Sequence, residues 1–357
     1  MVSRPASFRL TPAFVFCQDA ATILLGLTAA FLYNVFIAKR NVVIEMVFLH
    51  ALEGVLTIVI MVSVGYFLAA RGWFNQANSP LLPRLVNYVA LPAYMLWNLM
   101  STFDQSTLEH MLYGLAVPLL SMALCFAAAF AVAILIGVAS NHRGTFQAVF
   151  CCSSSIFVGL PVNLALFGET SVPYVLLYFL SNALFFWTIG NYCISRDGKA
   201  GSPKIFSLET LKNIFSPPLI GFVTALALIL LGIRLPDFII NTAKYLGGMT
   251  TPLSMLFIGT VVCGVKLRNL KLTRDMVAAL AGRFIVSPLA VLAVVYFIPI
   301  PLLMKKVFVI QAALPAITQT TIMAKVYEAD TEYADVLVSL TTILAMIAIP
   351  AYMVILS

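Results

Sequence analysis

Small polar side chains gather at two places in an otherwise very apolar sequence. One cluster lies just before Gly159 and Pro161, and the other follows Pro315. A helix interrupted inside a bilayer leaves backbone N–H groups unpaired, and these groups can bind an anion together with hydroxyl and amide side chains. We therefore expect both clusters to contribute to one anion site. The candidates are Ser153, Ser154, Ser155 and Asn163 at the first interruption, and Thr318, Gln319 and Thr320, with Gln311 and Thr321 nearby, at the second.

Two asparagines, Asn87 and Asn182, lie in otherwise apolar stretches and are further candidates for lining this site. The alternative for all of these side chains is a bond to a carbonyl of their own helix, or packing between neighbouring helices. A single serine or asparagine does not distinguish the two interpretations. Two polar clusters beside paired Pro/Gly interruptions favour binding, because such pairs are typical of the substrate sites of repeat-built transporters.

The composition predicts an all-α polytopic membrane protein. Hydrophobic residues make up 62% of the chain and charged residues 10%, whereas a soluble domain carries about 25% charged residues. The net charge of +7 does not indicate nucleic-acid binding, because the lysines and arginines concentrate in alternate short loops. Such loops normally face the cytoplasm, which places Met46 and Ser357 outside a cell membrane that the chain crosses many times.

Ten apolar stretches after Met46 are long enough to be transmembrane helices. Residues 195–214 are rich in Gly, Ser, Pro and charge, and we interpret them as a cytoplasmic linker between two five-helix halves, 46–194 and 215–357. The predicted spans are 46–70, 81–100, 113–138, 146–167, 171–194, 215–233, 236–263, 276–298, 305–326 and 335–356.

Prolines of the first half recur in the second half in the same order and at similar offsets, which supports an internal duplication. Because each half holds an odd number of helices, the two repeats must have opposite orientations in the membrane. The pairs are Pro92 with Pro252, Pro118 with Pro288, and Pro161 with Pro315.

Residues 1–45 stand apart from these repeats. Residues 20–38 are apolar enough to cross a bilayer, but basic residues flank them on both sides and give no orientation. We keep two interpretations, an extra N-terminal helix or a functional start at Met46.

Catalytic and metal-binding patterns are absent from the sequence. It contains no HExxH, GxGD or Walker A pattern, and its six cysteines show no CxxC and no metal-ligand spacing. We therefore expect no enzyme, no cofactor and no metal. The sequence also shows no charged ring or repeated filter loop of the kind expected in a channel.

Arg283, about seven residues into its span, has two interpretations. It attracts a dicarboxylate, or it reaches the cytoplasmic interface, which we favour.

Five stretches together resemble the auxin efflux carrier family, in order and over nearly all of residues 46–357. They are GYFLAARGWF (65–74), LVNYVALPAYMLWNL (85–99), FVGLPVNLALFGE (157–169), TTPLSMLFIGTVV (250–262) and the long C-terminal stretch 313–350. The resemblance implies ten helices in two inverted repeats with crossed, broken fourth and ninth helices. It also implies a scaffold of the first, second, sixth and seventh helices, beside a mobile transport domain.

The expected function is that of a secondary active transporter for small organic anions of the malonate or malate type, by alternating access. Malonate and malate come from the resemblance, since bacterial relatives are regarded as carriers of such carboxylates. The alternatives are an efflux carrier for auxin-like or other small metabolites, and a membrane sensor that binds such ligands without moving them. The sequence leaves open whether a proton or a sodium ion is coupled, and whether the chain forms a homodimer. The lipid bilayer is an expected partner, and nucleic acid is not.

Overall fold

The computed structural model describes residues 42–74, 78, 80–102, 113–199, 215–264 and 272–356. Within these ranges the chain forms helices and no β-strand, apart from one isolated bridge. The predicted all-α polytopic membrane protein is confirmed at this level, because five stretches are long and apolar enough to cross a membrane. They are Tyr113–Leu135, Glu169–Asp197, Asp237–Gly264, Arg274–Phe297 and Thr331–Tyr352. The expected N-terminal extension up to residue 41 and most of the 195–214 linker lie outside the described residues.

The first half consists of apolar helices, several of them joined end to end by short π or 3-10 turns. In chain order they are α2 (Val42–Ala70), α3 (Leu81–Leu85), η1 (Val86–Ala90), α4 (Leu91–Thr102), η2 (Tyr113–Leu115), α6 (Ala116–Leu135), α7 (Arg143–Cys151), α8 (Gly159–Phe167), η3 (Glu169–Ser171), α9 (Val172–Phe185), η4 (Phe186–Gly190) and α10 (Asn191–Asp197).

The second half follows a similar plan. Its elements are α12 (Pro217–Leu230), α13 (Asp237–Gly248), α14 (Thr250–Gly264), α15 (Arg274–Ala281), η6 (Gly282–Val286), α16 (Ser287–Phe297), α17 (Leu302–Ala312), α18 (Gln319–Val326) and α19 (Thr331–Leu356).

Two of the π turns have an identifiable cause in the sequence. The turn η1 ends two residues before Pro92, and η6 ends two residues before Pro288. Proline has no N–H to donate and its ring clashes with the carbonyl four residues earlier, so the preceding turn widens. This widening changes the direction of the side chains of Asn87 and Arg283, which lie inside the two turns.

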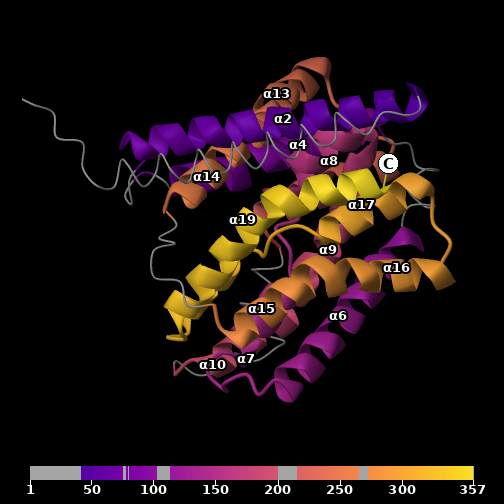
Figure 1. Cartoon of the computed structure of the whole chain (residues 1–357). Helices are drawn as coiled ribbons and strands as arrows, with labels where there is room; N and C mark the ends of the chain where they lie inside the picture. The colour runs from indigo at the N-terminus through magenta and orange to yellow at the C-terminus, as the bar shows by residue number, and fades with distance from the viewer. Residues whose placement is uncertain are drawn as a thin grey trace, which may run out of the picture.

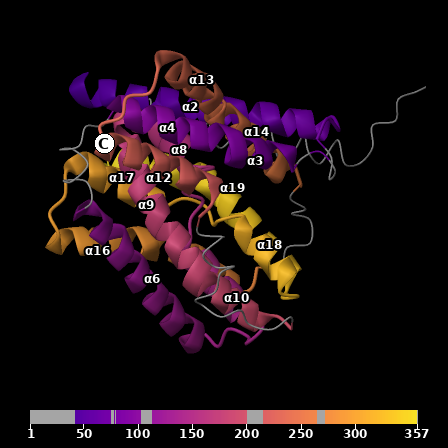
Figure 2. The same cartoon turned by 180° about the vertical axis from the view of Figure 1, so that it is seen from behind.

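The helices form two groups on opposite sides of the protein. The helices α2, α4, α13 and α14 lie on one side and α6, α15 and α16 on the other, with α19 between them (Figure 1). Seen from behind, α9 and α10 follow one another along the same diagonal as α6 of the second group, and α9 packs against α6 (Figure 2). In the first group, α2 packs against α14, and α4 packs against α12 and α13. A Cβ atom at Gly65 would lie 2.3 Å from the carbonyl oxygen of Leu256, so α2 and α14 approach backbone to backbone.

The cysteines in the described part of the chain are free thiols. Cys125, Cys151 and Cys152 are buried, and Cys193 and Cys263 are partly buried. No group of His, Cys, Asp and Glu among the described residues could hold a metal ion.

Candidate binding site at the two interrupted helices

The two interrupted helices meet at their interruptions. One runs from α7 to α8 and the other from α17 to α18, and the segments between them pair antiparallel through an isolated bridge between Ser153 and Ala316. The N–H of Ser154 donates to the carbonyl of Pro315 at 2.8 Å, and that of Ile317 donates to the carbonyl of Cys152 at 3.2 Å. Each non-helical segment therefore satisfies backbone groups of the other, as polar backbone buried in a membrane protein requires.

The two paired segments, 152–155 and 315–317, are called the crossing below. A side chain from the helix after each interruption forms hydrogen bonds with the backbone of the crossing. On α9, Asn182 Oδ1 accepts from the N–H of Ser153 at 2.9 Å, and Asn182 Nδ2 donates to the carbonyl of Ser153 at 2.8 Å. On α19, Thr341 Oγ1 accepts from the N–H of Ala316 at 3.0 Å. The bridged residues Ser153 and Ala316 thus each have a polar partner on the helix that follows the interruption of their own half.

The three predicted helix-break residues occupy different positions at the interruptions. Pro315 lies in the extended segment, whereas Gly159 is the first residue of α8 and Pro161 lies in its first turn. Proline is tolerated in a first turn because its missing N–H would have no helical partner there. Since the bridge pairs Ser153 with Ala316, Pro161 and Pro315 are not at equivalent positions of the two interruptions.

A cavity of about 510 Å³ lies beside the crossing and contains five of the predicted site residues. They come from η1, from the first interruption, from α9 and from the start of α18. The structure therefore brings together side chains that lie far apart in the sequence. The five are Asn87, Ser154, Ser155, Asn182 and Gln319.

The other predicted site residues do not line this cavity. Ser153 is buried with its Oγ 3.0 Å from Ser155 Oγ, and Asn163 donates from Nδ2 to the carbonyl of Gly159 at 2.7 Å. Thr318 directly precedes α18, and Thr320 is fully buried. The side chains of Ser153 and Asn163 therefore make hydrogen bonds within the first interrupted helix and do not face the cavity.

Sequence reasoning missed the aromatic part of the cavity. Five aromatic side chains line it, and none of the lining residues is charged. Ser216, at the N-terminal end of α12, adds a further hydroxyl. The aromatic residues are Tyr88, Phe157, Phe179, Trp187 and Phe215.

Three helices begin at or beside this cavity. Gln319 and Pro217, the first residues of α18 and α12, both line it, and Phe157 lies two residues before the start of α8. A helix N-terminus carries a partial positive charge and N–H groups without helical partners. The cavity can therefore attract negative charge without a lysine or an arginine in its lining.

A second hollow, of about 550 Å³, lies between α4, α12 and α13. Its polar side chains are limited to the hydroxyls of Tyr88, Thr224 and Thr242. Neither interruption contributes to this hollow. Because its lining is almost entirely apolar, it does not suit an anion.

A polar contact joins the far part of α4 to the segment between α8 and α9. Tyr94 Oη and Asn98 Nδ2 both donate to Glu169 Oε2, at 2.6 and 2.7 Å. Asn98 lies about three helical turns beyond the cavity residue Asn87. The contact therefore lies at another level of the protein than the cavity.

Arg283 does not reach the surface as expected. Its side chain is 0% exposed and contacts Ser287 and the carbonyl of Ala312. The favoured interpretation of Arg283 as an interfacial residue was wrong, because the π turn η6 directs it into the protein.

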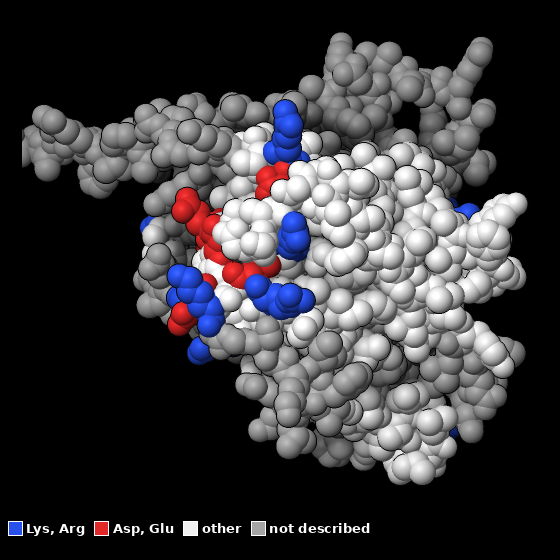
Figure 3. Space-filling model, turned by 90° about the horizontal axis from the view of Figure 1, so that it is seen from below, with Lys and Arg blue, Asp and Glu red and all other residues white. Residues whose placement is uncertain are grey.

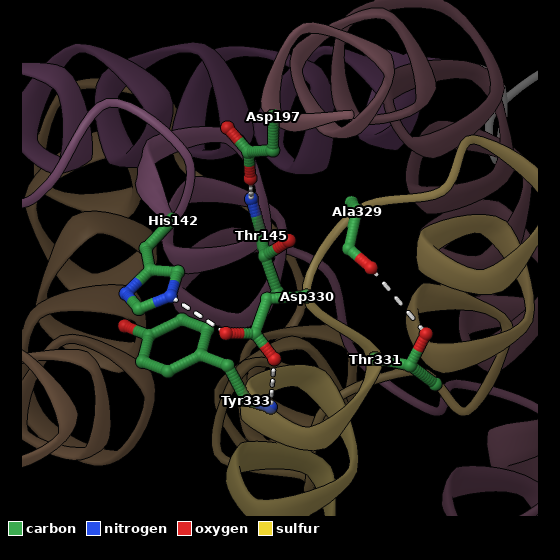
Figure 4. Close-up of polar contacts among 7 residues, drawn as sticks. All are labelled: His142, Thr145, Asp197, Ala329, Asp330, Thr331 and Tyr333. Carbon is green, nitrogen blue, oxygen red and sulfur yellow. Dashed lines mark hydrogen bonds and ion pairs between the residues drawn. The ribbon is translucent and has the colours of Figure 1, made fainter. Parts of the chain in front are cut away.

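Charged residues gather on one part of the face shown in Figure 3. A cluster of polar contacts forms where the N-terminal end of α7 meets the start of α19 (Figure 4). There, Asp330 Oδ2 lies 3.0 Å from Nε2 of His142, whose ring stacks on Tyr333 at 4.0 Å between centroids. The N–H of Tyr333 donates to Asp330 Oδ1 at 3.0 Å and, together with the His142 contact, lowers the pKa of Asp330. Asp197 accepts from the N–H groups of Gly144 and Thr145.

Comparison with known proteins covers the part of the chain that forms this site. Residues 50–353 match a family described as membrane transport protein. An uncharacterized transporter of Methanocaldococcus jannaschii is 26% identical over 307 residues, covering 84% of this chain and 96% of the relative. An uncharacterized transporter of Methanothermobacter thermautotrophicus is 25% identical over 312 residues, covering 87% of this chain and all of the relative.

Proposed function

This chain belongs to the membrane transport protein family, that of the auxin efflux carriers, and we propose that it is a secondary carrier for a small organic anion in the cell membrane. One observation carries this proposal. A cavity of hydroxyl and amide side chains lies where two interrupted helices cross and where three helices begin. The substrate binds there, and Ser154, Ser155, Asn182 and Gln319 supply neutral hydrogen bonds. Neutral donors suit an anion that must also be released.

The proposed topology is ten spans in two inverted halves. Its support is the similar order of elements in the two halves, each with one interrupted helix shortly before its end. The scaffold consists of α2, α3 with α4, α12, and α13 with α14, which pack against one another. The remaining helices carry the cavity residues of the crossing and form the moving part.

In this conformer the cavity lies on the side where the described chain resumes at residue 215. Residues 215–218, which follow the linker, line the cavity. On the other side, Tyr94 and Asn98 hold Glu169 and tie α4 to the moving part. Alternating access requires this contact to break when the cavity opens to the opposite side.

The lining favours a monocarboxylate with an apolar body over malonate or malate. A dicarboxylate brings two charges into a cavity that has no charged side chain in its lining, at a high desolvation cost. Five aromatic side chains offer an apolar body a large contact surface instead. Malonate and malate remain the alternative that the family resemblance supports.

The test is thermal-shift binding on purified protein, followed by flux into proteoliposomes for every ligand that binds. The panel contains indole-3-acetate and phenylacetate, malonate and malate, and amino acids. Stabilisation and flux with an aromatic monocarboxylate support the proposal, and the same result with malonate or malate supports the alternative. Binding without flux indicates a sensor. No response to any carboxylate, with a response to another class, overturns the organic-anion assignment.

A further inference from the structure

Arg283 places a guanidinium inside the protein, at the crossing of the two interrupted helices. Its side chain is 0% exposed and is the largest fully buried side chain among the described residues. Its Nη2 donates to the carbonyl of Ala312, the last residue of α17, and to Ser287 Oγ at 2.9 Å. The C-terminal end of α17 therefore contacts a positive charge directly.

The C-terminal end of the other interrupted helix lies close to the same charge. The turn η6 packs on α7 so closely that a Cβ atom at Gly282 would lie 2.1 Å from the ring of Phe150, the penultimate residue of α7. The end of α17 thus accepts a hydrogen bond from Arg283, and the end of α7 lies beside the turn that carries it.

The charges of this arrangement balance without a carboxylate. The C-terminal end of a helix carries about half a negative charge, so two such ends offset roughly one guanidinium. Among the described residues, no Asp or Glu forms an ion pair with Arg283. Nε and Nη1 of Arg283 have no protein partner within the described ranges, so donors remain for the end of α7 or for water.

In carriers with interrupted helices, unwound carbonyls and half-helix C-terminal ends often coordinate the coupling sodium ion. We propose that Arg283 takes the place of this cation. Its guanidinium is a fixed countercharge for the ends of α7 and α17, so the transport cycle needs no sodium ion at the crossing. This inference rests on the proposed carrier function for its meaning, but its central test requires no substrate.

The first test measures thermal unfolding of the purified wild-type protein in NaCl, KCl and choline chloride at equal ionic strength. We expect the same unfolding temperature in all three salts. A rise specific to sodium with Arg283 intact would overturn the proposal, because it would show a sodium site that Arg283 does not replace. This measurement uses no variant and so does not depend on how a variant folds.

The second test is chemical rescue of Arg283→Ala. We expect a lower unfolding temperature than in the wild type, restored by ethylguanidinium but not by neutral ethylurea, and a smaller loss in Arg283→Lys. The matched control is Gln311→Ala, which removes another fully buried polar side chain at the crossing, on α17. Equal effects of ethylguanidinium and ethylurea on Arg283→Ala, or equal rescue of Gln311→Ala, would assign Arg283 a packing role only.

Flux separates this proposal from the carrier function itself. With any substrate that the carrier moves, we expect equal initial rates in sodium and choline buffers. A sodium requirement for flux would overturn the role of Arg283 and leave the carrier function standing. Conversely, failure to find any flux would count against the carrier function. The salt and rescue results would still decide whether Arg283 offsets the negative charge of the two helix ends.

Discussion

Asn182 binds both backbone polar groups of Ser153 with a single side-chain amide, at 2.9 and 2.8 Å. The two residues are 1% and 0% exposed. This pair of bonds fixes α9 to the extended segment that the first interrupted helix contributes to the crossing. Because Asn182 also lines the cavity, the same residue joins the architecture of the crossing to the proposed binding site.

Asn182→Leu should destabilise the protein and lower ligand affinity. The carbonyl of Ser153 keeps the N–H of Ser155 as a donor, but the N–H of Ser153 loses its acceptor. A buried donor left without a partner costs about 1–3 kcal/mol. The measurement is unfolding in detergent, with Ser181→Ala as control, since the Ser181 hydroxyl bonds only a carbonyl of its own helix. Equal stability of the two variants would remove the structural role of Asn182.

Ser154→Ala and Gln319→Leu should each weaken binding of the anion by roughly tenfold or more, with normal membrane expression. Each change removes one hydrogen bond to a charged ligand, worth about 1.5–3 kcal/mol. Ligand titration by thermal shift measures the effect. The control is Ser63→Ala, whose hydroxyl donates to the carbonyl of Val59 within α2, away from the cavity. Wild-type binding and flux in the double variant would refute the site assignment.

The polar half of the cavity could be predicted from the sequence. An apolar stretch with Pro or Gly and a group of hydroxyl side chains has few explanations in a membrane protein. The aromatic half could not be predicted. The chain contains 26 phenylalanines and 13 tyrosines, and only the packing of helices decides which of them face one cavity. Phe179 on α9 and Phe215, two residues before α12, for example, line the same cavity.

The surroundings of Arg283 and Pro161 could not be predicted from their positions in the sequence. The position of Arg283 along its span suggested an interfacial side chain, but a π turn and the end of α17 bury it completely. Two prolines suggested two equivalent breaks, but Pro161 lies in the first turn of α8, whereas Pro315 lies in the extended segment before α18. In both cases the outcome depends on the neighbouring helix, which sequence position alone does not specify.

Glu169→Gln should favour the conformer in which the cavity opens away from the linker side. Tyr94 and Asn98 donate to one carboxylate oxygen, and charge-assisted bonds are roughly twice as strong as neutral ones. In a protein without its native cysteines, Gln319→Cys reports the change through labelling by a membrane-impermeant maleimide. We expect faster labelling from the Glu169 side. Asp237→Asn, on α13, is the control, and unchanged labelling in Glu169→Gln would show that this contact does not gate access.

Asp330 should stabilise the protein at neutral pH and lose this effect in acid. Its pKa is lowered below the ordinary 3.8, first by the bond from the Tyr333 N–H and then by His142. A carboxylate with a lowered folded-state pKa stabilises the fold above its unfolded-state pKa, and the contribution disappears as the pH falls through the lowered value. Asp330→Asn should therefore unfold at a lower temperature than the wild type at pH 7, and the gap should close below pH 3.8.

The control for Asp330→Asn is His142→Phe, which keeps an aromatic ring to stack on Tyr333 and removes the bond from Nε2. It should lose part of the stabilisation at pH 7 and keep the part that the Tyr333 N–H supplies. A gap between wild type and Asp330→Asn that is the same at every pH would mean that the carboxylate charge contributes nothing.

Gly259→Ala should loosen the packing of α2 on α14. A Cβ atom at Gly259 would lie 2.2 Å from the carbonyl oxygen of Val62, so the helices must separate to admit one methyl group. Small residues allow close helix approach in membranes, and overpacking typically costs about 1–3 kcal/mol. The matched control is Gly248→Ala, whose Cβ atom meets nothing within 4 Å. Unfolding in detergent should therefore show a clear loss for Gly259→Ala alone, and equal behaviour of both variants would mean that the α2–α14 approach can relax at no cost.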